Sequence, residues 1–256
     1  MALLWDEART ALGLLGAGST EPLEFRSTIS RRLLDPGNHL SSENSWSVFG
    51  RGAWPITSQA PESLALYGFV QARDSMAGPI YFGPDVAVFF SDGFLRTHCF
   101  RLVPADKGTI GLVGLGFEPA KRRRVPDIEG VLWLDREGKG LRRLEYRYTR
   151  LWAWVPRGSS GGQLEFDRLP GGQPILIGWT IRAPVARVQP WPEGAFVRDE
   201  TTRPFFGGGK VMLQGFREER GEVSDVRTTG GRVLWRQGTP PDSGGRPAVP
   251  SQGDHD

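Results

Sequence analysis

The chain has 256 residues with 32 Lys and Arg against 29 Asp and Glu, and an excess of three positive charges does not indicate a nucleic-acid-binding protein. Its single cysteine, Cys99, excludes an intrachain disulfide and any multi-cysteine metal site. No window of about 18 apolar residues is present, so the sequence predicts no membrane-spanning helix. Acidic residues interrupt the apolar run that a secretory signal would need, and the cytoplasm is the expected location if the start is genuine.

The first elements predicted along the chain are a helix and a strand pair. Residues 2–16 place their apolar side chains on one helical stripe, which contains Leu4, Ala8, Leu12 and Leu15. An extended segment from Leu23 then enters a turn at 35–38, and residues 39–53 are expected to return beside it. This part of the chain therefore predicts a helix followed by two antiparallel strands.

The segment from residue 61 to residue 94 mixes helix and strand signals. Pro61–Tyr67 predicts a short helix, and Ile80–Phe82 predicts a short strand. Pro84–Phe94 predicts a second helix, because proline is favoured in the first turn of a helix.

From residue 97 onward, short apolar segments alternate with turns that contain glycine. This alternation favours an antiparallel meander. The predicted strands are His98–Val103, Ile110–Glu118, Ile128–Leu134, Leu141–Thr149, Gln163–Arg168 and Pro174–Ile181. The pattern weakens after Pro184 and returns in three shorter strands, Val211–Arg217, Glu222–Val226 and Arg232–Trp235.

The clearest pattern lies in residues 125–149, which read as a hairpin. Its second arm alternates between two faces, with Leu144, Tyr146 and Tyr148 on one and Arg143, Glu145 and Arg147 on the other. This alternation is typical of a sheet with one buried face. The predicted fold is therefore mainly β (α+β), a curved antiparallel sheet or half-barrel with an N-terminal helix and one or two short helices. We expect a single β-rich domain over residues 1–236 and a disordered tail rich in Pro, Gly and Ser over residues 237–256.

Residues that could carry chemistry are few. The histidines, His39, His98 and His255, lack neighbours at metal-ligand spacing, so neither a metal site nor a cofactor is predicted. Asp85, Ser91, Asp92 and His98 could form the polar site of a hydrolase, although no nucleophile-elbow motif surrounds the serine. That hypothesis requires the histidine to lie beside a serine or carboxylate in an open cleft.

Several charged and polar residues have a structural interpretation instead. Asp127 and Glu129 alternate along one strand and are expected on a solvated face. The basic run 121–124 is expected to be a solvated connection between strands, and the thiol of Cys99 is expected to be buried and inert. None of these features predicts a catalytic residue.

The nine tryptophans keep a binding function open. Most are expected in the core, but aromatic residues can also line an apolar groove or stack against a sugar. The candidate groove residues are Trp133, Leu144, Tyr146, Tyr148, Phe166 and Trp179.

Three segments carry a resemblance to a known group: THCFRLV at 97–103, GLGFEPAKRRRVPDIEGVLWLDREGKGLRRLEYRYT at 114–149 and GGQLEFDRLPGGQPILIGWTIRAP at 161–184. They resemble bacterial carboxypeptidase regulatory-like domain-containing proteins, in the region that follows the β-sandwich of that name. The resemblance implies an exported protein of the periplasm or envelope and implies no peptidase chemistry. Residues 1–256 predict neither the leading sandwich nor a signal peptide, so we expect either a chain shortened at its N-terminus or a member that stays inside the cell.

The hairpin at Gly130–Tyr148 is also similar to hairpins of the periplasmic lipoprotein-carrier half-barrels, and this similarity implies an apolar groove for acyl chains. The first functional hypothesis is therefore a non-enzymatic envelope module that binds a lipid, another apolar ligand or an envelope protein on the concave face of its sheet. The alternatives are a hydrolase with a polar site near His98 and a structural spacer.

Overall fold

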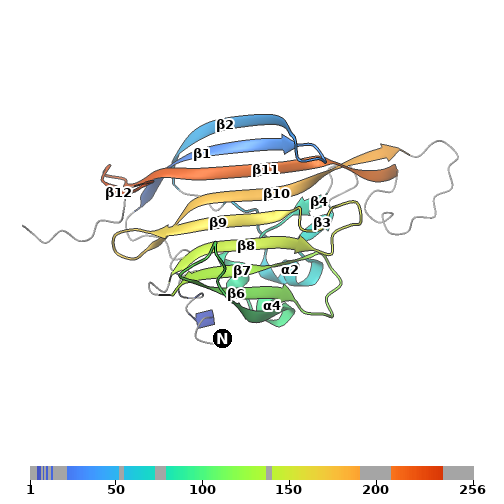
Figure 1. Ribbon diagram of the computed structural model, residues 1–256, viewed down its shortest axis with the longest axis horizontal. Coiled ribbons are helices and arrows are strands. Elements are labelled where there is room, and N and C mark those ends of the chain that lie inside the picture. Colours follow the sequence, from blue (N-terminus) through green and yellow to red (C-terminus); the bar gives the residue numbers. More distant parts are fainter. Residues whose placement is uncertain are drawn as a thin grey trace, which may run out of the picture.

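The computed structural model describes residues 22–51, 55–72, 79–136, 140–190 and 209–238, together with residues 5, 6, 8, 10 and 13. Strands make up 57% of the described residues and helices 12%, so the protein is mainly β, as the sequence predicts. Figure 1 shows one large antiparallel sheet that does not close into a barrel, with short helices behind one half of it. Most of the helix expected over 2–16 and all of 239–256 lie outside the described residues.

The large sheet contains ten strands, nine of which follow the order β2-β1-β11-β10-β9-β8-β7-β6-β5, while β12 pairs with β11. All of the pairings are antiparallel. The strands are β1 (Leu23–Leu34), β2 (Leu40–Gly50), β5 (His98–Val103), β6 (Leu112–Pro119), β7 (Asp127–Asp135), β8 (Leu141–Thr149), β9 (Gly161–Arg168), β10 (Pro174–Pro190), β11 (Gly209–Thr228) and β12 (Val233–Arg236). A separate hairpin is formed by β3 (Val70–Ala72) and β4 (Pro79–Tyr81).

One row of directly paired residues crosses the sheet from edge to edge and is apolar throughout. We call it the apolar row. In order from β5 to β2 it consists of Leu102, Leu115, Leu132, Leu144, Leu164, Trp179, Gly221, Ile29 and Trp46. Directly paired residues of neighbouring antiparallel strands point to the same face, so all of these residues lie on one face of the sheet.

Three short helices cover one half of that face: α2 (Pro61–Tyr67), α3 (Val86–Phe90) and α4 (Asp92–Thr97). They bury Leu64, Val88, Phe89 and Phe94 against side chains of β6, β7, β8 and β9, and this packing forms the main core. We call this face of the sheet the helix-covered face and the opposite face the polar face. In Figure 1 the labelled helices lie behind the half of the sheet that contains β6 to β8, whereas β1 and β2 lie at the other side.

The helix predicted over 84–94 is two helices, because a serine interrupts it. Asp85 caps the start of α3 by accepting a hydrogen bond from the Val88 amide at 2.8 Å. Ser91 then adopts an extended conformation, and its hydroxyl accepts from the Phe94 amide at 3.1 Å at the start of α4. Serine and aspartate favour these cap positions because their side chains replace a missing backbone partner.

The C-terminal strands are longer than the sequence predicts. β10 continues through Pro184 to Pro190, with a bulge between Val185 and Ala186. β11 is a single strand of 20 residues in place of two short ones. Proline cannot donate a ladder hydrogen bond, and Pro184 lies where β10 pairs with β11 alone, because the described pairing with β9 ends at Arg182. The predicted hairpin of β7 and β8 and the α2 helix are confirmed.

A second, smaller cluster lies where β12 folds back on the sheet. Leu169, Ile175, Val223 and Val226 are buried there, with Trp235 packed against them. The indole nitrogen of Trp235 donates to Asp167 Oδ2 at 2.8 Å. This contact holds the end of β11 and β12 against β9.

Candidate functional site

Four of the six candidate groove residues lie in the main core. Leu144, Tyr146, Tyr148 and Phe166 belong to β8 and β9, point to the helix-covered face and are no more than 5% exposed. The prediction that one face of β8 is buried is therefore confirmed. These side chains pack against the protein's own helices and would not contact a ligand in this conformation.

The other two groove candidates lie elsewhere. Trp133 pairs with Arg143 and Gly114, so it lies on the polar face, opposite to the other five residues. It is 5% exposed. Trp179 is partly buried on the helix-covered face, at the boundary between the two hydrophobic clusters.

The helix-covered face continues beyond the half that the helices bury. Trp179, Ile29 and Trp46 are all partly buried, and the neighbouring Leu33 and Val48 are 46% and 41% exposed. The registers of β1 with β11 and β2 place these side chains on the same face as the apolar row. We call this group of five residues the open half. The row from Trp179 to Trp46 joins the buried core to the edge strand β2, whereas Leu33 is separated from that row by Arg31.

A charged pair lies beside the open half. Arg31 donates to Glu219 Oε2 at 2.9 Å, and its guanidinium lies 5.4 Å from the centre of the Trp46 ring. The Arg31 side chain is 55% exposed, so the ion pair is accessible to solvent. A polar boundary therefore lies directly next to the apolar surface.

Tyr81, a partly buried residue of the β3–β4 hairpin, lies against the buried Tyr146 and Tyr148 of β8. The rings of Tyr81 and Tyr148 are 5.3 Å apart, and those of Tyr146 and Tyr148 are 5.7 Å apart. Burial raises the pKa of all three phenols above the usual value. The hydroxyls of Tyr81 and Tyr146 have no hydrogen-bond partner among the described residues.

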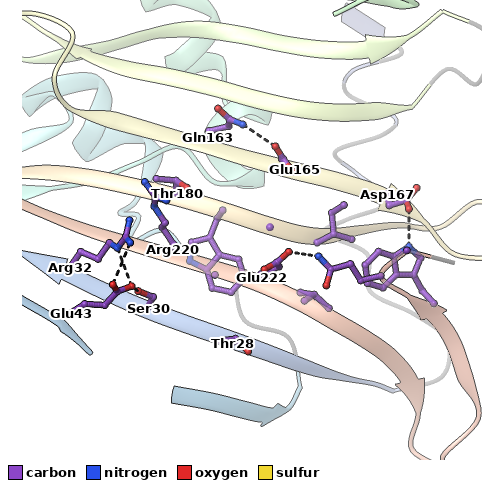
Figure 2. Close-up of a pocket in the computed structure, with 18 residues that line it drawn as sticks. Thr28, Ser30, Arg32, Glu43, Gln163, Glu165, Asp167, Thr180, Arg220 and Glu222 are labelled. Atoms are coloured by element: carbon purple, nitrogen blue, oxygen red, sulfur yellow. Dashed lines mark hydrogen bonds and ion pairs between the residues drawn. The ribbon is translucent and has the colours of Figure 1, made fainter. Parts of the chain in front are cut away.

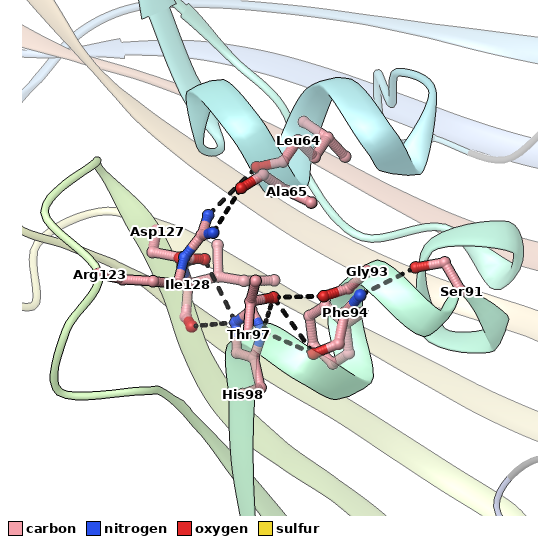
Figure 3. Close-up of polar contacts among 10 residues, drawn as sticks. All are labelled: Leu64, Ala65, Ser91, Gly93, Phe94, Thr97, His98, Arg123, Asp127 and Ile128. Carbon is pink, nitrogen blue, oxygen red and sulfur yellow. Dashed lines mark hydrogen bonds and ion pairs between the residues drawn. The ribbon is translucent and has the colours of Figure 1, made fainter.

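His98 lies in a sealed polar network, which Figure 3 shows between α2, α4, β5 and β7. Its Nε2 atom lies 3.2 Å from Asp127 Oδ1, and its Nδ1 atom lies 3.2 Å from the Phe94 carbonyl. Both the His98 and Asp127 side chains are at most 1% exposed. The carboxylate also accepts from Arg123, whose guanidinium donates to the carbonyls of Leu64 and Ala65 at the end of α2.

This network corrects two sequence predictions. Asp127 is buried and ion-paired, not on a solvated face, and Arg123 of the basic run is 11% exposed and locks a loop against α2. A third prediction is also wrong, since Cys99 is exposed.

The residues proposed for a hydrolase do not form a site. His98 contacts a carboxylate, but its side chain is only 1% exposed, and Ser91 and Asp85 serve as helix caps. The hydrolase hypothesis therefore gains no support from the geometry. No cluster of His, Cys, Asp and Glu among the described residues could hold a metal ion.

The polar face contains a groove of about 580 Å³ across β1, β11, β10 and β9 (Figure 2). Its lining includes Glu165 and Glu222, which flank Gly178 in directly paired positions. Glu165 accepts from Gln163 at 2.9 Å, and Glu222 accepts from Gln237. These two carboxylates are thus held by neighbouring side-chain amides.

A ladder of ion pairs runs along the same face. Glu218 is 5% exposed and lies 2.6 Å from Arg220, 3.8 Å from Arg32 and 4.0 Å from Arg182. Arg32 continues the ladder to Glu43 on β2 at 3.0 Å. The charged groups of this surface therefore neutralise one another.

Comparison with protein-family models, curated proteins and solved structures finds no match to this chain. Within the described residues, no helix has the length and apolar character needed to cross a bilayer.

Sequence reasoning missed the most unusual feature of the surface, the open half. Ile29 and Trp46 stand in segments that read as polar strands, and the residues that pair them with Trp179 come from the distant β11. The available signal was the isolated tryptophan in a run of serines at 41–47. A large aromatic side chain in an otherwise polar edge strand indicates a contact across the sheet.

Proposed function

We propose that the protein is a non-enzymatic binding module that holds an apolar ligand against the open half. The observation that carries the proposal is the apolar row, which continues past the helices to the edge of the sheet through Trp179, Ile29 and Trp46. Val48 lies next to this part of the row and is exposed, and the exposed Leu33 lies on the same face beyond Arg31. Contiguous exposed apolar surface of this kind typically marks a binding site.

The dimensions of the open half suit an acyl chain. From β10 to β2 the row crosses three strand spacings, which amount to about 14 Å. Each methylene group buried there would contribute about 0.8 kcal/mol, so a partly covered chain suffices for measurable affinity. Arg31 and Glu219 at the boundary would remain in water beside the ligand.

The proposed setting is the bacterial envelope. It rests on the resemblance of about residues 1–184, strongest from residue 80 onward, to exported proteins, and on that of the β7–β8 hairpin to lipoprotein-carrier half-barrels. An open antiparallel sheet covered on one face by short helices supports this proposal. The ligand would be a lipid or another acyl compound. An envelope protein that offers an apolar segment is the alternative occupant.

Native mass spectrometry of protein from a bacterial host, followed by organic extraction, tests the proposal. We expect a co-purifying acyl compound, and saturable binding of a fluorescent fatty-acid analogue by protein from which it has been extracted. Ile29→Asn and Trp46→Ser should weaken probe binding, whereas Thr28→Asn on the polar face should not. A clean apo mass together with no saturable probe binding would contradict the proposal.

A further inference from the structure

The edge strand β2 is long and lacks the features that normally protect a sheet edge. It spans 11 residues, and in the described part of the chain it pairs only with β1. Its outer side therefore presents a row of backbone N–H and C=O groups without strand partners. Natural proteins protect such edges with Lys, Pro, bulges or very short strands.

β2 uses few of these protections. The sequence Leu40–Gly50 contains neither Lys, Arg nor Pro, and its pairing with β1 from Ser42 to Gly50 has no bulge. Its single charged residue, Glu43, is bound by Arg32 and Ser30. The opposite edge, β5, has six residues, and Trp5 packs against its Phe100 at 4.6 Å between ring centres.

We propose that β2 pairs antiparallel with β2 of a second copy of this chain, around a twofold axis at Trp46. Trp46 then faces its own copy, and the apolar row continues from one protomer into the other. In this register Ser45 faces Ser47 of the other copy, and Glu43 faces Phe49. No like charges oppose each other, because the strand's single charge lies away from the axis.

Symmetry and size define the expected assembly. A twofold strand pairing uses the same surface on both protomers, so it closes at the dimer. The contact consists of one strand pair and a few side chains, which is small for a permanent interface. The dimer should therefore form and dissociate with protein concentration.

Charge substitutions on β2 test the pairing directly. Ser45 and Ser47 are exposed on the polar face, so S45K/S47K and S45E/S47E should both fold. In the proposed register each double variant places like charges opposite each other at two positions. Each variant alone should lose the dimer, and an equimolar mixture should restore it as a heterodimer, because Lys then faces Glu.

The experiment is sedimentation velocity of the wild-type chain over a wide concentration range, together with both variants and their mixture. Circular dichroism checks that each variant is folded. The control is I110K/A153K, which adds the same charge at exposed positions away from β2 and should dimerise like the wild type. A wild-type chain that stays monomeric at the highest concentration, a species larger than a dimer, or a mixture that fails to associate would overturn the proposal.

Discussion

His98 Nε2 of β5 lies 3.2 Å from Asp127 Oδ1 of β7, and both side chains are at most 1% exposed. The other ring nitrogen faces the Phe94 carbonyl at 3.2 Å, so both nitrogens of the imidazole have acceptors. Arg123 approaches the same carboxylate from the opposite side. The Asp127 carboxylate of β7 therefore contacts β5 through His98. It is connected to the end of α2 through Arg123, which donates to the Leu64 and Ala65 carbonyls.

Replacing Asp127 with Asn should strongly destabilise the fold. The substitution keeps the shape of the side chain but leaves the Arg123 guanidinium without its buried counter-charge, at a cost of about 3 to 5 kcal/mol. Chemical denaturation monitored by circular dichroism measures the loss.

An exposed pair of the same residue types serves as the control. His39 Nδ1 lies 3.1 Å from Asp35 Oδ2, but the His39 side chain is 83% exposed. Asp35→Asn should change stability little, because water screens an exposed pair. Equal losses of unfolding free energy in the two variants would contradict the assignment of the larger loss to the burial of the Asp127 network.

Gly221 is needed because the Trp179 ring lies over it. A Cβ atom at Gly221 would lie 2.0 Å from Trp179 Cζ2, so Gly221→Ala should displace the indole and cost about 1 to 3 kcal/mol. Thermal unfolding measures the loss of stability, and tryptophan emission measures the displacement of the indole. The neighbouring Gly178→Ala is the control, since the nearest atom to its added Cβ would be 3.6 Å away.

A double-mutant cycle tests whether the indole is the cause. Trp179→Leu removes the ring, so the Gly221→Ala substitution should cost much less in that background than in the wild type. Additive losses in the double variant would contradict the assignment of Gly221 to Trp179.

The sequence predicted local elements well and their assembly poorly, for physical reasons. Alternation in β8 identifies its buried face because a strand with one wet side must alternate. The position of β11 between β1 and β10 follows from pairings between residues near 25 and residues near 220, and no local pattern specifies such contacts.

The candidate site was harder to predict for the same reason. Trp133 and Trp179 look alike as isolated aromatic residues in strands, yet the register places them on opposite faces. Asp127 alternates with Glu129 as a surface carboxylate would, and its burial beside His98 of β5 follows from a contact that no local pattern specifies. Side chains whose partners are distant in the sequence were therefore the ones misplaced.

Glu218 should contribute more to stability than the other carboxylates of the polar face. It is buried among Arg32, Arg182 and Arg220, and Glu218→Gln would remove the charge that all three arginines share. The expected loss is about 1 to 3 kcal/mol, because the arginines are left poorly partnered. Glu43→Gln, at the exposed end of the ladder, should have a much smaller effect. Urea titration of the two variants and the wild type measures both losses of unfolding free energy.

The buried tyrosines predict a loss of stability in alkali. Burial raises the pKa values of Tyr146 and Tyr148 above the usual value of 10.0, so the folded protein favours their neutral form. Below about pH 10 the phenols are neutral in both the folded and unfolded chains, and stability is unaffected. Above it the unfolded chain ionises first, and each tyrosine should cost about 1.4 kcal/mol per pH unit.

Unfolding by urea at several pH values above 9 measures this slope. The Y146F/Y148F double variant should show a shallower fall, because it removes two of the groups that ionise only on unfolding. At neutral pH the Tyr146→Phe substitution should cost little, since the hydroxyl has no partner among the described residues. Tyr67→Phe, at a site that is 59% exposed, is the control. A double variant that loses stability in alkali as steeply as the wild type would place the sensitive groups elsewhere in the chain.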